Sequence, residues 1–110
     1  MRTIENIILP PKGYKAITLG PFIFIKKGTV LSYRDINHEA IHWEQQKEMI
    51  IIPFFLWYVI EFAVKYIYYR FKWHKAYRSI SFEREAYSNQ ETMTYLNDRK
   101  SFAWINYIKL

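Results

Sequence analysis

The sequence predicts an α+β fold in which a small antiparallel sheet packs on a helical core that carries an H-E-x-x-H helix and a glutamate helix. Three observations support this prediction. β-Branched and aromatic runs alternate with turn residues early in the chain, an H-E-x-x-H motif stands at the start of a predicted helix, and a later polar segment contains two glutamates. With 110 residues and no repeats or linkers, residues 1–110 are expected to form one domain.

The composition limits the classes of protein and of site. Hydrophobic residues make up 51% of the chain and aromatic residues 20%, which is too rich for a disordered chain. No cysteine is present, so any metal must be held by histidine and carboxylate side chains. The net charge of +6 would favour nucleic acid, anionic lipid or acidic substrates, but no nucleic-acid motif accompanies it, so no nucleic acid is expected as a partner.

The predicted strands lie between residues 15 and 32. The runs KAITL, FIFI and TVLS are separated by Gly20-Pro21 and by residues 26–28, which contain two lysines and a glycine. This pattern predicts two or three short antiparallel strands.

Three helices are expected after the strands. Asp35 or Asn37 would cap the first, from near His38 to about Met49. Residues 50–60 are almost wholly apolar around Pro53, and a second helix is expected to restart near Glu61 and Lys65. The third would begin near Phe82, capped by Ser79 or Ser81, and reach about Leu96; residues 97–110 suit a short packed helix or a strand.

The motif His38-Glu39-Ala40-Ile41-His42 predicts a metal site. On a helix, the spacing of four brings both imidazoles to one face, where a single ion can bridge them. Zinc in hydrolytic sites typically keeps three protein ligands and a water. Glu39 is suited to act as general base, taking a proton from metal-bound water whose pKa the ion lowers to about 7.

The third ligand must come from elsewhere in the chain. Glu83 is the first candidate and Glu85 the alternative, because two positions along a helix turn the side chain by about 200° and both cannot face one ion. The small Ala86, three residues after Glu83, would let the two helices pack closely and favours Glu83. His74 is a weaker candidate.

Four more residues are candidates for supporting roles. Gln45 and its neighbour Gln46 follow His42 by three and four positions, so one could hydrogen-bond a ligand or substrate, although solvated helix surface is the more usual setting. Tyr77 and Arg78 precede the glutamate helix and could donate to the oxyanion that develops during peptide hydrolysis.

The apolar segment 49–64 is too short to predict a membrane span, which needs about 20 residues. A buried or interfacial helix fits better. The basic residues that follow could dock on anionic headgroups, or could extend their charges into water from a core helix: Lys65, Arg70, Lys72, Lys75 and Arg78. Residues 1–14 lack the apolar segment of a secretory signal, so a cytoplasmic location is expected, with membrane association as an addition.

The H-E-x-x-H motif followed by Glu83-Arg84-Glu85-Ala86 resembles the gluzincin metallopeptidases. The sequence looks most like the single-domain minigluzincins, whose scaffold is shared with the membrane-bound CAAX prenyl protease and heat-shock peptidase families. The resemblance covers residues 15–96. In the larger relatives Ala-Asp follows the ligand glutamate, whereas this chain has Ala86-Tyr87.

The resemblance implies a zincin-like domain and a zinc peptidase acting on peptides or proteins, with an edge strand that aligns the substrate beside the metal helix. Residues 22–25 or 29–32 would supply that edge. Minigluzincins can be latent, with a chain terminus over the site, a role that the aromatic C-terminal segment could take. The alternative is therefore a latent or inactive zinc-binding scaffold that binds a partner or a membrane surface.

Overall fold

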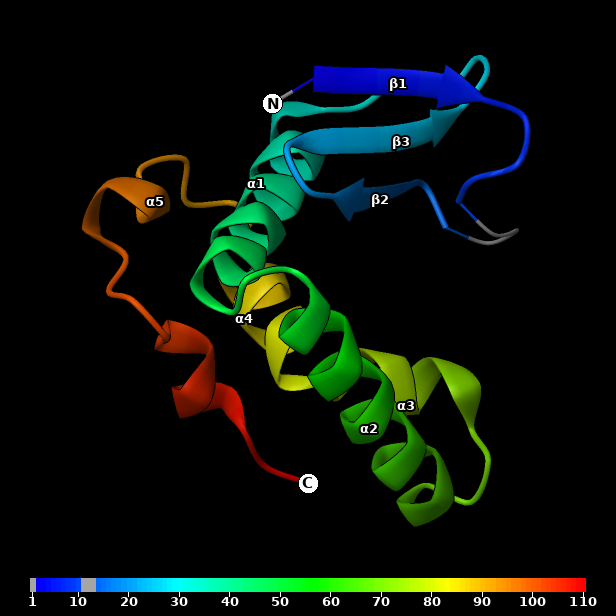
Figure 1. Ribbon diagram of the computed structural model, residues 1–110, viewed down its shortest axis with the longest axis vertical. Helices are drawn as coiled ribbons and strands as arrows, with labels where there is room; N and C mark the ends of the chain where they lie inside the picture. The colour runs from blue at the N-terminus through cyan, green and yellow to red at the C-terminus, as the bar shows by residue number, and fades with distance from the viewer. Residues whose placement is uncertain (1, 11–13) are drawn as a thin grey trace.

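The computed structural model describes residues 2–10 and 14–110, and it is an α+β structure with the sheet at one end and the far end of a long helix at the other (Figure 1). The elements follow in chain order: strands β1 (Arg2–Asn6), β2 (Ala16–Leu19) and β3 (Phe22–Lys26); helices α1 (Tyr33–Glu48), α2 (Ile52–Tyr68), α3 (Trp73–Arg78), α4 (Ser81–Asn89) and α5 (Tyr95–Asp98); and a 3₁₀ helix η1 (Ala103–Tyr107). The α+β class expected from the sequence is confirmed.

The sheet is mixed rather than antiparallel. Its order is β1-β3-β2: β2 and β3 form the expected antiparallel pair, with Ile17 opposite Phe24, but β1 runs parallel to β3, with Ile4 opposite Phe24. β1 was not predicted because its sequence, RTIEN, is mostly polar, as suits an edge strand with exposed side chains. β3 is the central strand, so the prediction that residues 22–25 form an edge is wrong.

Residues 29–32 are not a strand but lead into α1. Ser32 is the N-cap, its side chain accepts from the Asp35 backbone N–H, and the Asp35 carboxylate accepts from the Ser32 backbone N–H. The helix therefore begins about a turn earlier than expected, with Asp35 in its first turn rather than at its cap. Asn37 lies within the helix, and its amide donates to the Asn89 and Gln90 carbonyls at the end of α4.

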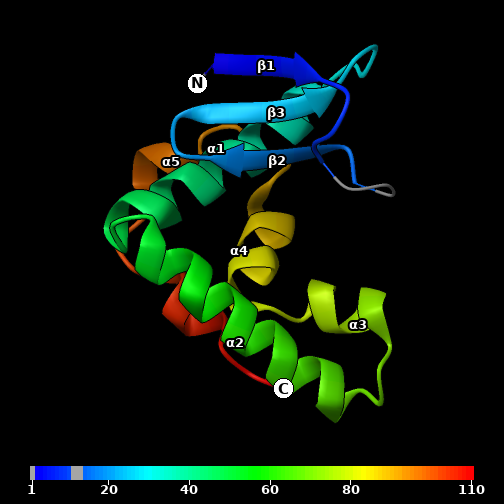
Figure 2. The same ribbon diagram turned by 45° about the vertical axis from the view of Figure 1, so that its right-hand side comes forward.

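α2 leaves α1 at a bend of 111° and is continuous from Ile52, since Pro53 lies in its first turn, where the missing N–H costs nothing (Figure 2). The expected restart near Glu61 is wrong. Glu61 and Lys65 do not interrupt the helix. They form a buried ion pair, with 2.7 Å between the Lys65 Nζ and a carboxylate oxygen of Glu61, and the two residues are 8% and 3% exposed. Among the described helices, none is by itself long and apolar enough to cross a bilayer.

Glu61 also fixes the start of α4. Its carboxylate accepts from the backbone N–H of Ser81 at 2.7 Å and from the Ser81 hydroxyl at 2.6 Å. It thereby replaces the side-chain cap that was expected from Ser79 or Ser81; the N-cap residue is Ile80, which has no polar side chain. α4 ends at Asn89, well before the expected Leu96.

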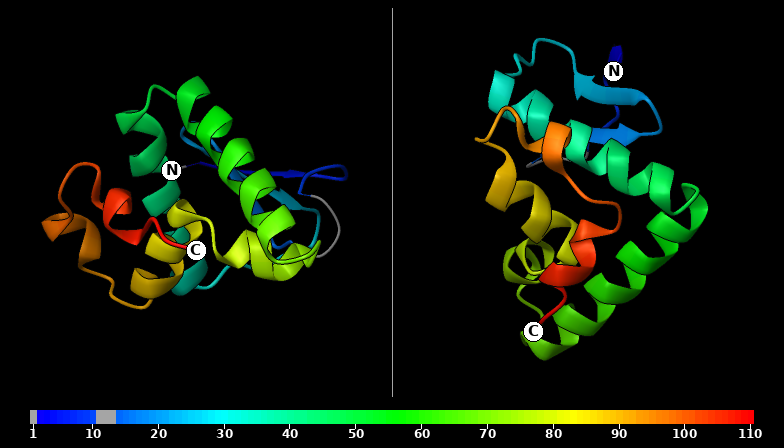
Figure 3. Two further views of the ribbon diagram at one scale, coloured as in Figure 1. Left: turned by 90° about the horizontal axis from the view of Figure 1, so that it is seen from below. Right: turned by 90° about the vertical axis from the view of Figure 1, so that its left-hand side faces the viewer.

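The C-terminal segment packs back on α4 through η1, which lies with α4 on one side of α2 (Figure 3). Trp104 is 4% exposed and joins Phe54, Ile80 and Phe82 in the core cluster. The helix, one of the two structures expected for this segment, is the one formed.

A buried charge network fastens this segment to the rest of the protein. The Arg99 side chain is 4% exposed and donates to Glu48 at the end of α1 and to Glu85 on α4. Tyr95 also donates to Oε2 of Glu85, at 2.7 Å. The three segments are therefore joined at one guanidinium group.

We expect Arg99→Met to lower the free energy of unfolding by about 3–5 kcal/mol, because it leaves the buried carboxylates of Glu48 and Glu85 without a counter-charge. Arg34→Met, which removes an exposed pair with Glu91, is the matched control and should cost less than about 1 kcal/mol. Urea titration followed by circular dichroism measures both; equal losses would show that the Arg99 network does not act as a buried charge cluster.

Candidate metal centre

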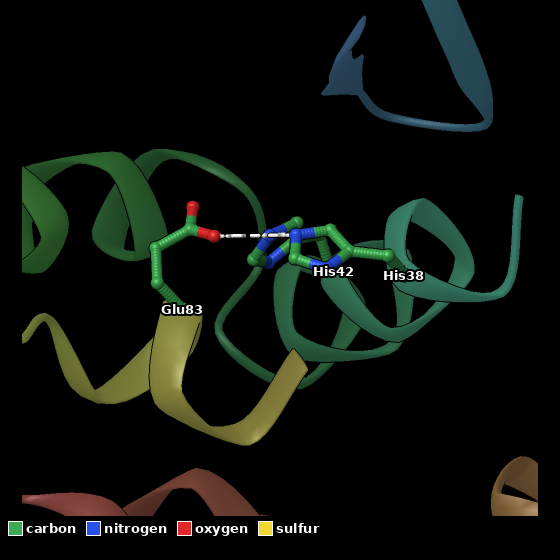
Figure 4. A group of neighbouring side chains, drawn as sticks. All are labelled: His38, His42 and Glu83. Atoms are coloured by element: carbon green, nitrogen blue, oxygen red, sulfur yellow. Dashed lines mark hydrogen bonds and ion pairs between the residues drawn. The ribbon is translucent and has the colours of Figure 1, made fainter. Parts of the chain in front are cut away.

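Three ligand atoms from two helices meet at one point. His38 and His42 stand one turn apart on α1, and Glu83 reaches them from α4 (Figure 4). The two Nε2 atoms are 3.1 Å apart, and Glu83 Oε1 lies 3.2 Å from Nε2 of His38 and 3.1 Å from Nε2 of His42. All three residues are buried. The structure thus brings together the three residues predicted as ligands.

The spacing of these atoms fits a zinc ion. Tetrahedral bonds of about 2.0–2.1 Å place ligand atoms about 3.3–3.4 Å apart. The observed separations of 3.1–3.2 Å differ from this by a few tenths of an ångström. Three such ligands occupy one face of a tetrahedron and leave the fourth position for water or substrate, the arrangement typical of hydrolytic zinc sites.

Both imidazoles are oriented by amide oxygens. Nδ1 of His38 lies 2.8 Å from Oε1 of Gln90, and Nδ1 of His42 lies 2.8 Å from Oε1 of Gln45. An amide oxygen can only accept, so each Nδ1 carries a ring proton, and in the neutral imidazole Nε2 presents its lone pair to the centre. These neutral amides orient the histidine rings, as a carboxylate does in many zinc sites.

The orientation of Gln45 is itself fixed. Its Nε2 donates to the Phe82 carbonyl at 3.1 Å and to Glu85 at 3.0 Å, so its oxygen must face His42. Gln46 binds the sheet instead, donating to the Thr18 carbonyl and accepting from the Gly20 N–H, both at 2.8 Å. Both glutamines are buried, so the prediction that they form solvated helix surface is wrong: the helix passes between sheet and α4 and has little free surface there.

The second oxygen of Glu83 has a partner that the sequence did not reveal. The Tyr58 hydroxyl on α2 donates to Oε2 of Glu83 at 2.7 Å, which leaves Oε1 directed at the histidines. Tyr58 lies in an apolar run without a motif and is one of ten tyrosines in the chain, so no spacing signal could have singled it out.

The electrostatics of the centre favour a cation. Burial opposes a negative charge on Glu83, but the two nearby histidines hold the pKa of Glu83 well below its usual range. Burial likewise opposes a charge on His42, yet Coulombic attraction to Glu83 and a hydrogen bond that His42 donates to Glu83 raise the pKa of His42 to about 9. A carboxylate facing two imidazole lone pairs therefore binds a positive charge strongly, whether a proton or a metal ion.

Glu39 lies beside this centre without joining it. Its Oε2 is 4.0 Å from Nε2 of His38, and its Oε1 accepts from the Thr18 hydroxyl of β2 at 2.7 Å. Burial raises the pKa of Glu39, although the nearby histidines and Thr18 oppose that shift. A carboxylate of raised pKa, held within reach of one water molecule from the centre, has the properties of a general base.

The other sequence candidates lie elsewhere. Glu85 points away from the histidines and is engaged by Arg99, as the turn of about 200° from Glu83 requires. His74 is exposed and lines a neighbouring cavity. Arg78 stacks on the Tyr87 ring at 3.7 Å from its centroid, while Tyr77 faces the site and burial raises its pKa far above the usual range.

Two cavities meet at Glu39. One, of about 310 Å³, is largely apolar; it includes His42 and Glu83 and is walled mainly by Ile17, Phe54, Phe55, Tyr58 and Phe62. The other, of about 430 Å³, is more polar; it includes His38 and is walled partly by Lys15, Arg34, Asp35, His74 and Gln90. Glu39 and Tyr77 line both cavities, so the proposed base stands at the junction of a two-part cleft.

Comparisons with known proteins provide no relative for this chain: no family model matches it, and neither a curated protein nor a solved structure shows significant similarity to it. The argument for the site therefore depends on its geometry.

We expect the purified protein to bind one zinc ion, and His42→Ala and Glu83→Ala each to weaken binding by more than the 10–100-fold typical of residues that only orient a ligand. His74→Ala removes the remaining histidine, which lies outside the cluster, and is the matched control. Elemental analysis and competition with a chromophoric chelator measure stoichiometry and affinity. Equal affinity in the His42 and His74 variants would exclude this centre.

Zinc affinity should also depend on pH. Because the pKa of His42 is raised to about 9 in the metal-free protein, zinc must displace a proton at any lower pH. The apparent dissociation constant should therefore rise by about tenfold for each pH unit below about 9, and level off above it. Chelator competition at several pH values, corrected for the titration of the chelator, tests this; an affinity independent of pH would contradict it.

Proposed function

We propose that the protein is a zinc-dependent hydrolase that cleaves peptide bonds. The observation that carries this proposal is the triangle of His38, His42 and Glu83 at zinc spacing, with the buried Glu39 carboxylate 4.0 Å from one ligand atom. Zinc held there would lower the pKa of a coordinated water to about 7 and polarise a substrate carbonyl. His38, His42 and Glu83 are the proposed ligands.

Glu39 is the proposed general base. The Thr18 hydroxyl occupies one carboxylate oxygen and leaves the other toward the centre, which fixes the direction of proton transfer. Its raised pKa brings the carboxylate closer to the pKa of the water that it would deprotonate. The same group could then deliver the proton to the leaving amine.

The open edge of β2 is the proposed support for an extended substrate. The Thr18 carbonyl binds Gln46 rather than β3, so the backbone N–H and C=O of Thr18 point away from β3, to the open edge. In an antiparallel pair every second residue points the same way, so the backbone groups of Ala16 also point to this edge. Ala16 and Thr18 both line the apolar cavity. Gln46 already binds the Thr18 carbonyl and the Gly20 N–H, so a peptide would pair at the Ala16 end.

The two cavities suggest a substrate preference. The wall of aromatic and aliphatic side chains around the smaller cavity would favour an apolar side chain next to the scissile bond, and the cavity on the other side of Glu39 would accept a polar one.

Tyr77 stays neutral because its pKa is strongly raised, so its hydroxyl could donate to the developing oxyanion. Arg78, which is stacked on Tyr87, is not proposed for this role.

A zinc-binding scaffold without catalysis is the second candidate function. Tyr87 stands where the larger gluzincins have aspartate and packs on the His38 ring with centroids 4.5 Å apart, and Nδ1 of that histidine faces the neutral amide of Gln90 rather than a carboxylate. Latency through the C-terminus has less support: within the described chain, neither cavity is lined by residues 91–110. The resemblance to gluzincins favours the peptidase.

We expect Glu39→Gln to reduce peptide hydrolysis by at least about 10²–10⁴-fold, because the amide cannot accept the proton, while zinc content is unchanged. Glu44→Gln on the same helix, whose carboxylate pairs with Lys47 at the surface, is the matched control and should keep full activity. Mass spectrometry of a peptide library that varies the residues flanking the cleavage site provides the assay. Zinc-loaded wild-type protein that cleaves no peptide would favour the scaffold.

A further inference from the structure

On α2, apolar side chains face outward and the charged side chains face inward. Every exposed residue of this helix is apolar or aromatic, while Glu61 and Lys65 are buried. The exposed set runs the whole length of the helix: Ile52, Pro53, Leu56, Trp57, Val59, Ile60, Ala63, Val64, Ile67 and Tyr68. A helix that faces water shows the opposite arrangement, with its charges outward.

The exposed apolar face of α2 lies along one side of the molecule, since the helix has α4 and η1 on its inner side (Figure 3). It begins at the α1–α2 turn, where Ile50 is 80% exposed. Ile50 and Ile51 have φ of 56° and 53°, which β-branched residues rarely adopt, so an apolar side chain is kept at this turn despite its conformational cost. So many exposed apolar side chains on one helix indicate a face that something other than water covers.

Positive charges stand at the other end of this surface. Arg70, Lys72 and Lys75 are exposed directly after α2, and Trp73 between them is 55% exposed. An apolar helix face followed by basic and aromatic residues is the pattern of helices that lie in the interface of an anionic bilayer. The net charge of +6 acts in the same direction.

The chemistry of the face favours lipid over a protein partner. Protein interfaces carry about one hydrogen bond per 100–200 Å² to fix their register. The exposed side of α2 offers almost no polar group for this purpose, since the Trp57 N–H is already bonded to Glu61 and the Tyr68 hydroxyl lies at the last residue. Acyl chains need no such groups.

We propose that the exposed face of α2 docks in the surface of an anionic lipid bilayer, with the helix axis along the membrane plane and residues 70–75 at the headgroups. The helix has 17 residues and is not a span by itself. This inference concerns the outer face of α2 and does not rest on the proposed zinc site or on catalysis.

Co-sedimentation of the full chain with phosphatidylcholine vesicles, with and without phosphatidylglycerol, tests the proposal. We expect binding to the mixed vesicles that is stronger than binding to phosphatidylcholine alone and falls with salt. Ile67→Glu should weaken it by about tenfold or more, because one large apolar side chain is lost from the membrane and a negative charge is added. Val30→Glu, at a residue that is 81% exposed but outside this face, is the matched control and should bind like wild type.

Two further measurements test the same proposal. Lys72→Gln combined with Lys75→Gln changes only exposed residues and should lower binding to anionic vesicles without changing the circular dichroism spectrum. Absence of vesicle binding, or equal binding by the Ile67 and Val30 variants, would overturn the proposal. So would sedimentation equilibrium showing a lipid-free dimer that Ile67→Glu dissociates, since a second copy would then cover the face.

Discussion

The structure is organised around one electrostatic constraint: two imidazole lone pairs and a carboxylate oxygen are held 3.1–3.2 Å apart in a buried position. These atoms are stable together only with a proton or a metal ion among them, and neighbouring side chains hold them in place. Gln45 and Gln90 set the imidazoles, and Tyr58 sets the carboxylate. The arrangement leaves His42 protonated at neutral pH when no metal is bound, and it offers the same three atoms to a metal ion.

Two of the buried charges outside the centre connect separate helices. Glu61 of α2 binds the first residue of α4, and Arg99 joins the carboxylates of α1 and α4. Burying these groups requires desolvation, which their mutual attraction and hydrogen bonds offset only in this geometry. The polar contacts therefore define how the helices are placed, while the cluster around Phe54, Phe82 and Trp104 supplies the apolar burial.

The sequence predicted what local spacing determines and missed what tertiary packing determines. Helical geometry alone predicts that His38 and His42 share a face and that Glu83 and Glu85 cannot both reach it, whereas the packing of α4 on α1 decides that Glu83 is the one that does. Gln45 and Gln46 were misjudged because polar residues on a helix are usually solvated, and β1 because an edge strand needs few apolar residues. Glu61 was expected to interrupt the apolar helix because the sequence around it does not show that its carboxylate caps the N-terminus of α4.

The two faces of α2 are mechanically linked. Tyr58 and Glu61 stand one turn apart on its inner side; the first holds Glu83 directly, and the second holds the helix turn on which Glu83 stands. A tilt or rotation of α2 would consequently displace the third ligand, whereas an ion that draws Glu83 toward the histidines would stiffen the attachment of α2. If docking on the outer side of this helix tilted it, Glu83 would shift, and by reciprocity an ion bound at the three side chains would alter that docking.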